Sequence, residues 1–144
     1  MRKFIQERYF PFISFMLKST HAFGFIEALV DTGSPFTVLS TIDALKLRLP
    51  IKTMRKGEPV QIAGFTFLKA PLGNSHMTFR TEDQKHLTVE HNSLGVLIPT
   101  KLDLKQLEAI KHIPSIVGND FLEQQKFGLY VNPSAKVAYL ERTP

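Results

Sequence analysis

Short apolar runs separated by turn-forming residues recur along most of this chain. Residues 9–17 and 23–30 are rich in Phe, Ile, Leu and Val, so we expect two buried strands joined by a turn at residues 18–21. Residues 36–39 form a third, shorter apolar run. The pattern is typical of a protein built mainly from β-strands.

Further strands are expected in pairs in the middle and at the end of the chain. Residues 60–62 and 65–68 flank Ala63-Gly64, and Gly64 provides flexibility at the tip of this predicted hairpin. A second pair covers residues 76–81 and 87–97. A third pair covers residues 127–131 and 137–141, around an Asn-Pro-Ser turn.

Helix signals appear at three places. Ser40 is a predicted N-cap, with Asp43 in the third position of a capping box and the helix ending near Leu47. Asp120 and Glu123 form a second capping box near the end of the chain.

The third predicted helix covers residues 100–112. The apolar residues expected on its core-facing side are Leu104, Leu107 and Ile110.

Composition and charge narrow the class of protein. The 144 residues, 43% of them hydrophobic, are expected to form one domain spanning 1–144. The net charge of +5 is spread along the chain without a long basic run, so we expect no nucleic-acid partner. The first apolar run is too short to cross a bilayer as a helix and contains Pro11, so we expect no membrane association and a cytoplasmic location.

Candidate chemistry concentrates at Asp31. This carboxylate directly follows the apolar residues 28–30 and begins the sequence Asp31-Thr32-Gly33-Ser34. A charge drawn toward the interior costs several kcal/mol or more unless it is paired or hydrogen-bonded. Thr32 and Ser34 offer hydroxyl donors, and Gly33 allows close approach of backbone N–H groups. An ordinary β-turn would also use Asp and Gly, so the tetrapeptide alone does not decide the function.

Residues 28–34 resemble the active-site segment of the aspartic proteases, in which two hydrophobic residues precede Asp-Thr-Gly and then Ser or Ala. Residues 37–39, Thr-Val-Leu, match the continuation in the small, single-lobed, retropepsin-like members. Residues 116–122, Ile-Val-Gly-Asn-Asp-Phe-Leu, resemble the closing segment of that family, where a short helix packs behind the active site. The two matches occur in the expected order near the two ends of the chain.

The resemblance implies a mainly β, closed β-barrel-like retropepsin (acid protease) fold with short helices. It also implies that Asp31 is the catalytic acid/base and that Thr32 hydrogen-bonds across a dimer. Gly33 would approach the substrate closely, and Ser34 would hydrogen-bond the carboxylate. Thr32 and Ser34 could equally cap the local turn.

Aspartic proteolysis requires two carboxylates, whereas the chain has one Asp-Thr-Gly and is too short for two lobes. A two-fold homodimer would supply the second Asp31. The expected activity is therefore that of an aspartic endopeptidase on peptide or protein substrates, with no cofactor and no metal. The five histidines form no helical His-x-x-x-His pair. The alternatives are a dimeric peptide-binding or assembly module with little or no proteolysis, and a monomer activated in a larger assembly.

By its order in the chain, the segment 57–72 corresponds to the flap that closes over substrate in the family, although an ordinary surface hairpin would give the same pattern. The residues expected to contact substrate are Phe36, Val38, Ala63, Gly64 and Phe65.

Two positions depart from the family pattern. Asn119 replaces an Arg that is frequent in the closing segment, and Pro35 replaces the acidic residue that pairs with this Arg in retroviral enzymes. Both members of the pair are therefore missing together. The predicted helix at residues 100–112 has no counterpart in the minimal retroviral enzymes, and we expect it to be an insertion that packs on the core.

Overall fold

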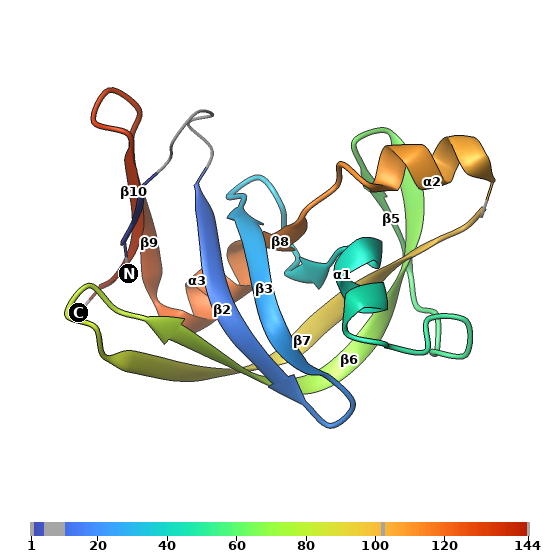
Figure 1. Ribbon diagram of the computed structural model, residues 1–144, viewed down its shortest axis with the longest axis horizontal. Coiled ribbons are helices and arrows are strands. Elements are labelled where there is room, and N and C mark those ends of the chain that lie inside the picture. Colours follow the sequence, from blue (N-terminus) through green and yellow to red (C-terminus); the bar gives the residue numbers. More distant parts are fainter. Residues whose placement is uncertain (1, 5–10, 102, 144) are drawn as a thin grey trace.

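A computed structural model describes residues 2–4, 11–101 and 103–143 of the chain (Figure 1). The strands are β1 (Arg2–Phe4), β2 (Phe12–Ser19), β3 (Phe23–Val30), β4 (Val38–Leu39), β5 (Pro59–Ile62), β6 (Phe65–Arg80), β7 (His86–Pro99), β8 (Ser115–Val117), β9 (Phe127–Asn132) and β10 (Val137–Arg142). The helices are α1 (Thr41–Lys46), α2 (Leu104–Ile110) and α3 (Asn119–Gln125). The chain is mainly β, as predicted.

Strands β2, β3, β8, β4, β7 and β6 form a closed barrel. They are hydrogen-bonded in this order, and β2 also pairs with β6, which closes the ring. β5 extends the sheet beyond β6, and β1, β10 and β9 form a separate three-stranded sheet. Closure leaves these six strands with few unpaired edges, which limits edge-to-edge association.

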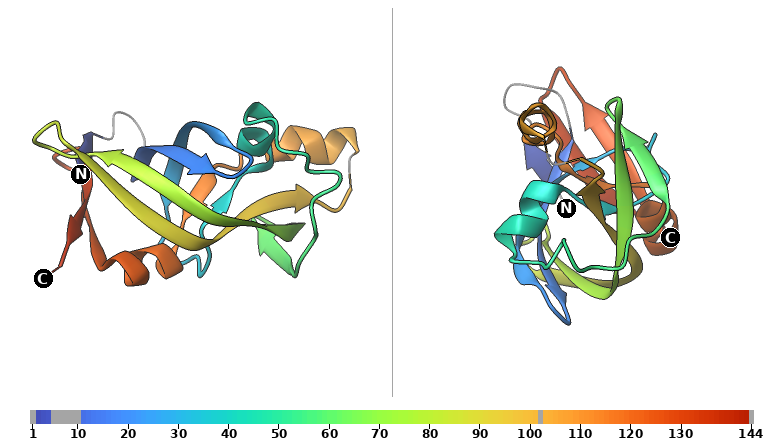
Figure 2. Two further views of the ribbon diagram at one scale, coloured as in Figure 1. Left: turned by 90° about the horizontal axis from the view of Figure 1, so that it is seen from below. Right: turned by 90° about the vertical axis from the view of Figure 1, so that its right-hand side faces the viewer.

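The sixteen-residue strand β6 belongs both to the barrel and to a protruding hairpin. Its first half pairs with β5 and its second half with β2, while β7 accompanies it along most of its length. The register with β7 shifts twice between Pro71 and Ser75, and Gly73 has a positive φ of 86°. Such bulges bend a strand, and β6 curves accordingly (Figure 2).

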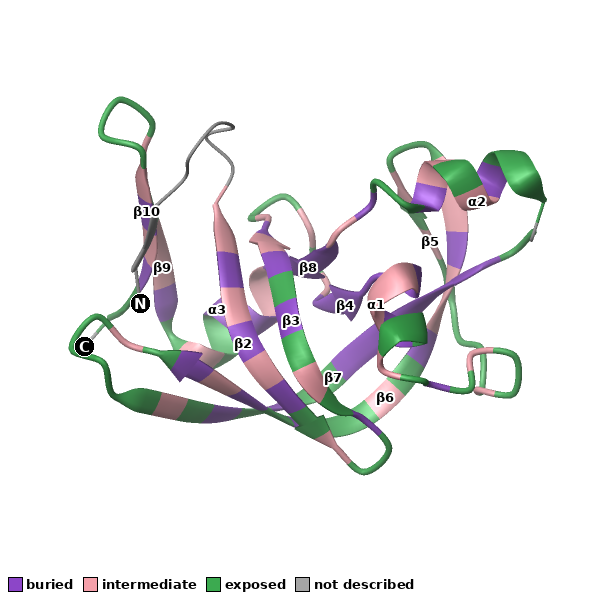
Figure 3. Cartoon of the chain, viewed as in Figure 1, coloured by how far each residue is buried: buried purple, intermediate pink, exposed green. Residues whose placement is uncertain are grey.

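Alternation of apolar residues builds the barrel core (Figure 3). Along β2, Ile13, Phe15 and Leu17 point inward and are buried, while their neighbours are more exposed. An aromatic row crosses the core: the ring centroids of Phe15 and Phe79 lie 5.4 Å apart, and those of Phe79 and Phe121 lie 5.8 Å apart. This row joins β2 and β6 to α3.

A second apolar cluster lies under α2. Ile110 of α2 is buried, and Leu107 packs on the cluster together with Val60 and Phe65 of the β5–β6 hairpin. The predicted insertion helix therefore packs on the core, but it covers only Leu104–Ile110. The prediction that Leu104 faces the core was wrong, because this residue is 83% exposed. Gln106 is buried in its place.

Most predicted strand pairs are confirmed, with shifted ends. The first strand begins at Phe12, and the predicted residues Tyr9 and Phe10 lie outside the described part of the chain. The strand predicted at residues 36–39 is reduced to β4. The Ser40 N-cap is confirmed, since its hydroxyl accepts a hydrogen bond from Asp43 N–H at 3.1 Å.

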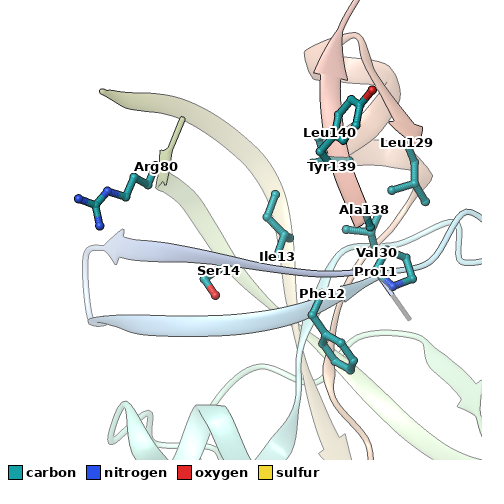
Figure 4. A pocket seen from close by; sticks show the side chains of 10 residues that line it. All are labelled: Pro11, Phe12, Ile13, Ser14, Val30, Arg80, Leu129, Ala138, Tyr139 and Leu140. Atoms are coloured by element: carbon teal, nitrogen blue, oxygen red, sulfur yellow. The ribbon is translucent and has the colours of Figure 1, made fainter. Parts of the chain in front are cut away.

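The three-stranded sheet packs beside the barrel and leaves a cavity of about 190 Å³ between them (Figure 4). Its walls are mostly apolar and include Pro11 and Ile13 from the barrel side and Ala138 and Leu140 from β10. None of the residues 31–38 lines this cavity. Among the described residues, no helix is both long enough and apolar enough to cross a membrane.

We expect Phe79→Ala to destabilise the fold by roughly 3–5 kcal/mol, because it removes a buried ring from the middle of the aromatic row. Phe23→Ala is a matched control, since Phe23 is 69% exposed and its loss should change stability by less than about 0.5 kcal/mol. Denaturant unfolding of both variants measures the difference. Equal losses would contradict the assigned core.

Candidate active site

Asp31 lies at the end of β3, where the barrel sheet gives way to a turn. Strand β3 runs parallel to β8, and Val30 pairs with Val117. Asp31 N–H continues this pairing by donating to Val117 O at 3.0 Å. The backbone of Asp31 is therefore fixed by the sheet, while its side chain is only partly buried.

Backbone donors hold the turn that follows. Gly33 N–H donates to Asp31 Oδ1 at 2.9 Å, and Ser34 N–H donates to Asp31 O at 3.1 Å. The close approach of Gly33 to the carboxylate agrees with the prediction from the sequence. The Ser34 hydroxyl instead donates to Phe36 O at 2.9 Å, so the expected hydrogen bond from Ser34 to the carboxylate is not formed in this structure. Thr32 is exposed.

The start of α3 braces the same turn from behind. Asn119 N–H donates to Ser34 O at 2.8 Å, and Asn119 Nδ2 donates to Thr32 O at 2.5 Å. Gly118 makes this approach possible, because a Cβ atom there would lie 2.2 Å from Phe36 O. Asn119, at the position where the family often has Arg, thus has a structural contact of its own with the turn.

Asp120 connects the far end of the turn to α3. Its Oδ1 accepts hydrogen bonds from Thr37 Oγ1 at 2.6 Å and from Phe121 N–H at 2.7 Å, and Thr37 Oγ1 accepts from Gly118 N–H at 3.0 Å. The prediction that Asp120 caps α3 was wrong. The N-cap is Gly118; Asp120 lies in the first helical turn, where its carboxylate is bound to Thr37, 83 residues away.

The pKa of Asp120 is lowered from its ordinary value of 3.8. Partial burial raises the pKa, but hydrogen bonds from His91, Thr37 and the Phe121 N–H stabilise the carboxylate and outweigh burial. Folding therefore favours the ionised form of the Asp120 carboxyl group.

His91 is a component of the site that the sequence did not reveal. It lies on β7, is fully buried, and places Nε2 3.4 Å from Asp120 Oδ2. The alternating pattern of the strand predicts only whether this position is buried and gives no reason for an imidazole there.

An apolar pocket of about 280 Å³ opens beside the turn. It is formed by residues 34–36 and Val38 on one side and by the strand β5 on the other. Phe36 and Val38, predicted to contact substrate, both line it. Ala63 and Gly64 do not; they form the exposed tip of the β5–β6 hairpin, with φ values of 51° and 82° that suit a tight two-residue turn. Phe65 packs in the second apolar cluster instead.

The other four aspartates are placed elsewhere. Asp43 accepts a hydrogen bond from Ser115 Oγ at 2.6 Å, Asp103 caps α2, and Asp83 lies in the turn between β6 and β7. Asp120 lies behind the turn, bound to α3 and Thr37. Within the described ranges, no group of three or more His, Asp or Glu side chains is placed to hold a metal ion.

Comparison with known proteins supports the fold. Models of known protein families and the sequences of curated proteins give no match. Among solved structures, the chain is similar to a retropepsin-like aspartic protease from Rickettsia conorii, with a TM-score of 0.57 and 17% sequence identity. The match covers 98% of this chain and 97% of the other chain. The predicted retropepsin-like fold is confirmed, and at this identity the similarity concerns the fold alone.

We expect Gly118→Ala to destabilise the protein by roughly 1–3 kcal/mol, because its methyl group would displace the backbone at Phe36. Gly128→Ala is a suitable control, since its Cβ would lie 3.8 Å from the nearest contact, Glu141 O. Urea unfolding compares the two. A destabilisation by Gly128→Ala as large as that by Gly118→Ala would argue against a tight contact between α3 and the turn.

The lowered pKa of Asp120 predicts a loss of stability in acid. A carboxylate with a depressed pKa stabilises the folded state above its ordinary pKa of 3.8, and this contribution is lost as the pH falls through the lower folded value. Asp120→Asn should therefore be less stable than the wild type at pH 6, and the difference should shrink toward pH 2. Thermal unfolding across this pH range measures it; a constant difference would contradict the assignment.

Proposed function

We propose that this protein is an aspartic endopeptidase in which Asp31 of each subunit of a homodimer contributes one catalytic carboxylate. The observation that carries the proposal is the setting of Asp31. Its carboxylate is only partly buried, is oriented by the Gly33 N–H, and belongs to a turn whose outgoing segment lines an apolar pocket. The retropepsin-like fold supports the same activity.

The dimer follows from the chemistry. One ionised carboxylate takes a proton from water while a second, protonated carboxylate polarises the scissile carbonyl. The remaining aspartates of this chain are engaged in other contacts or lie in other turns. A two-fold axis beside the turn would bring Asp31 against its own copy. Thr32, exposed next to it, is the residue proposed to contact the partner.

Two such carboxylates share one proton over a wide pH range. At a separation of about 3 Å they repel by roughly 5 kcal/mol at an effective dielectric of 20. This repulsion corresponds to about 4 pK units between the two macroscopic titrations, which belong to the pair. The reactive state with a single proton is then the main species between these titrations, so the rate optimum should be acidic to near neutral.

The substrate is proposed to be an extended peptide with apolar side chains. Phe36, Val38, Val60 and Ile62 give the pocket an apolar surface that matches such a side chain. The hairpin that carries β5 ends at Ala63-Gly64, and we assign it the role of the flap.

The decisive experiment compares wild type with Asp31→Asn on a mixed peptide library. Asn keeps the shape of the side chain but cannot act as acid or base, so cleavage should fall by about 10²- to 10⁴-fold while the fold persists. Asp83→Asn, in the exposed turn between β6 and β7, serves as the control and should cleave normally. Binding of peptides without cleavage by the wild type would favour the peptide-binding module instead.

A second test addresses mechanism and assembly. Activity should peak at acidic to near-neutral pH, resist chelators and be blocked by a pepstatin-like inhibitor, because two carboxylates perform the chemistry. Sedimentation should show that active material is dimeric and that dilution lowers specific activity. Abolition by chelators together with insensitivity to the inhibitor would reject the mechanism.

A further inference from the structure

The histidine on β7 is placed behind the turn but is not exposed at it. The His91 side chain is fully buried, its ring packs edge-on against Phe121 at 5.7 Å between centroids, and it belongs to neither the pocket nor the flap. A polar ring in such a position is costly unless its nitrogens are hydrogen-bonded. Its contacts therefore matter to the structure around it.

Both ring nitrogens face oxygen atoms on α3. Nδ1 lies 2.9 Å from Gln124 Oε1, and Nε2 lies 3.4 Å from Asp120 Oδ2 and 3.3 Å from Ser93 Oγ. An N–H on Nε2 would lie next to Asp120 Oδ2, which also accepts the Ser93 hydroxyl at 3.4 Å. In these contacts Asp120 is the charged partner, whereas Gln124, Ser93 and Phe121 are uncharged.

From Asp120 the contacts lead directly to the turn. One carboxylate oxygen faces His91, while the other accepts the Thr37 hydroxyl at 2.6 Å. Thr37 Oγ1 in turn accepts Gly118 N–H, and the adjacent Asn119 holds the carbonyls of Thr32 and Ser34. The orientation of the Asp120 carboxylate thus fixes both the end of the turn and the start of α3.

We propose that His91 is a positioning residue for the Asp31 turn, acting through Asp120 and Thr37. It holds one oxygen of Asp120 so that the other is directed at Thr37, and it ties β7 to α3 behind the turn. This assignment rests on the proposed function for its effect on catalysis, but the structural effect on the turn is independent of any activity.

The charge pattern explains why an imidazole suits this position. Asp120 is partly exposed, whereas His91 is fully buried, so the imidazole meets the carboxylate from its inner side. A histidine reaches the carboxylate from the barrel interior, with a small ring that packs among aromatic side chains. Removal of His91 would leave Asp120 Oδ2 with the long hydrogen bond from Ser93 Oγ at 3.4 Å, so that the carboxylate can rotate away from Thr37 more easily.

The test uses His91→Leu, which keeps a similar volume and the apolar contacts but removes the polar contacts of the ring with Gln124, Ser93 and Asp120. His91→Gln retains an amide that can donate to Asp120, so its behaviour should lie between that of His91→Leu and that of the wild type. His76→Leu, at an exposed position on β6, is the control. The first readout is hydrogen exchange at the amides of Gly118 and Asn119, which should speed up by roughly tenfold in His91→Leu only.

Kinetics and acid stability provide two further readouts. In His91→Leu, kcat should fall by about tenfold or more, while KM changes by less than about threefold, because the Asp31 carboxylates are misplaced whereas the β5 side of the pocket is unchanged. In His91→Leu the loss of thermal stability on acidification should begin at a higher pH. The reason is that the variant lacks the hydrogen bond from His91, which lowers the pKa of Asp120 in the wild type.

A double-mutant cycle tests the path. Once Asp120→Asn is present, adding His91→Leu should cause little further change in exchange at Gly118 and Asn119. Fully additive effects, or unchanged exchange in a folded His91→Leu protein, would overturn the proposal. If His91→Leu does not fold, the cycle is run with His91→Gln, whose smaller effect on exchange should also disappear once Asp120→Asn is present and would overturn the proposal if it did not. An inactive wild type would refute the proposed function, whereas the exchange measurement would still decide the role of His91.

Discussion

The candidate site depends on one constraint: the Asp31 carboxylate at the end of a barrel strand must stay accessible to solvent and yet be held in a fixed orientation. Parallel pairing of β3 with β8 fixes the backbone up to Asp31, and the amide of Gly33 fixes the side chain. The start of α3 then holds the turn through Asn119. β8 leads directly into α3, so the strand that pairs with β3 before the turn and the helix that holds the turn itself are consecutive in the chain.

This arrangement explains why residues distant in sequence behave as one unit. Thr37 lies in the segment before β4, Asp120 on α3 and His91 on β7, yet the three share one continuous set of polar contacts behind the turn. A buried polar network stabilises a single conformation only when each member is satisfied. The partial exposure of Asp31 and the full burial of His91 show how the site divides into an outer, accessible side and an inner, rigid side.

Local patterns were sufficient to predict much of the fold. The alternation in β2, the two-residue turn at Ala63-Gly64 and the Ser40 cap are each decided by residues close together in the chain, and the structure confirms them. The retropepsin-like fold was recognisable because two short motifs occur in order near the two ends of the chain.

Predictions failed where a distant residue offers a better partner than a near one. Asp120 was expected to be the N-cap of α3, but it lies in the first helical turn, where its carboxylate accepts the Thr37 hydroxyl from 83 residues away as well as the Phe121 N–H. Ser34 bonds the carbonyl of Phe36 instead of the carboxylate. His91 gave no signal, because alternation along a strand predicts burial and says nothing of the carboxylate on the neighbouring helix. Leu104 follows the helical period, but the short α2 leaves it at the exposed first turn.

The continuity of β6 has a mechanical consequence. One unbroken strand runs from the hairpin beside the pocket to the seam where the barrel closes against β2. The hairpin and the seam are therefore parts of one strand, and the bulged stretch between Pro71 and Ser75 is the place where this strand can bend so that the hairpin moves while the seam stays closed.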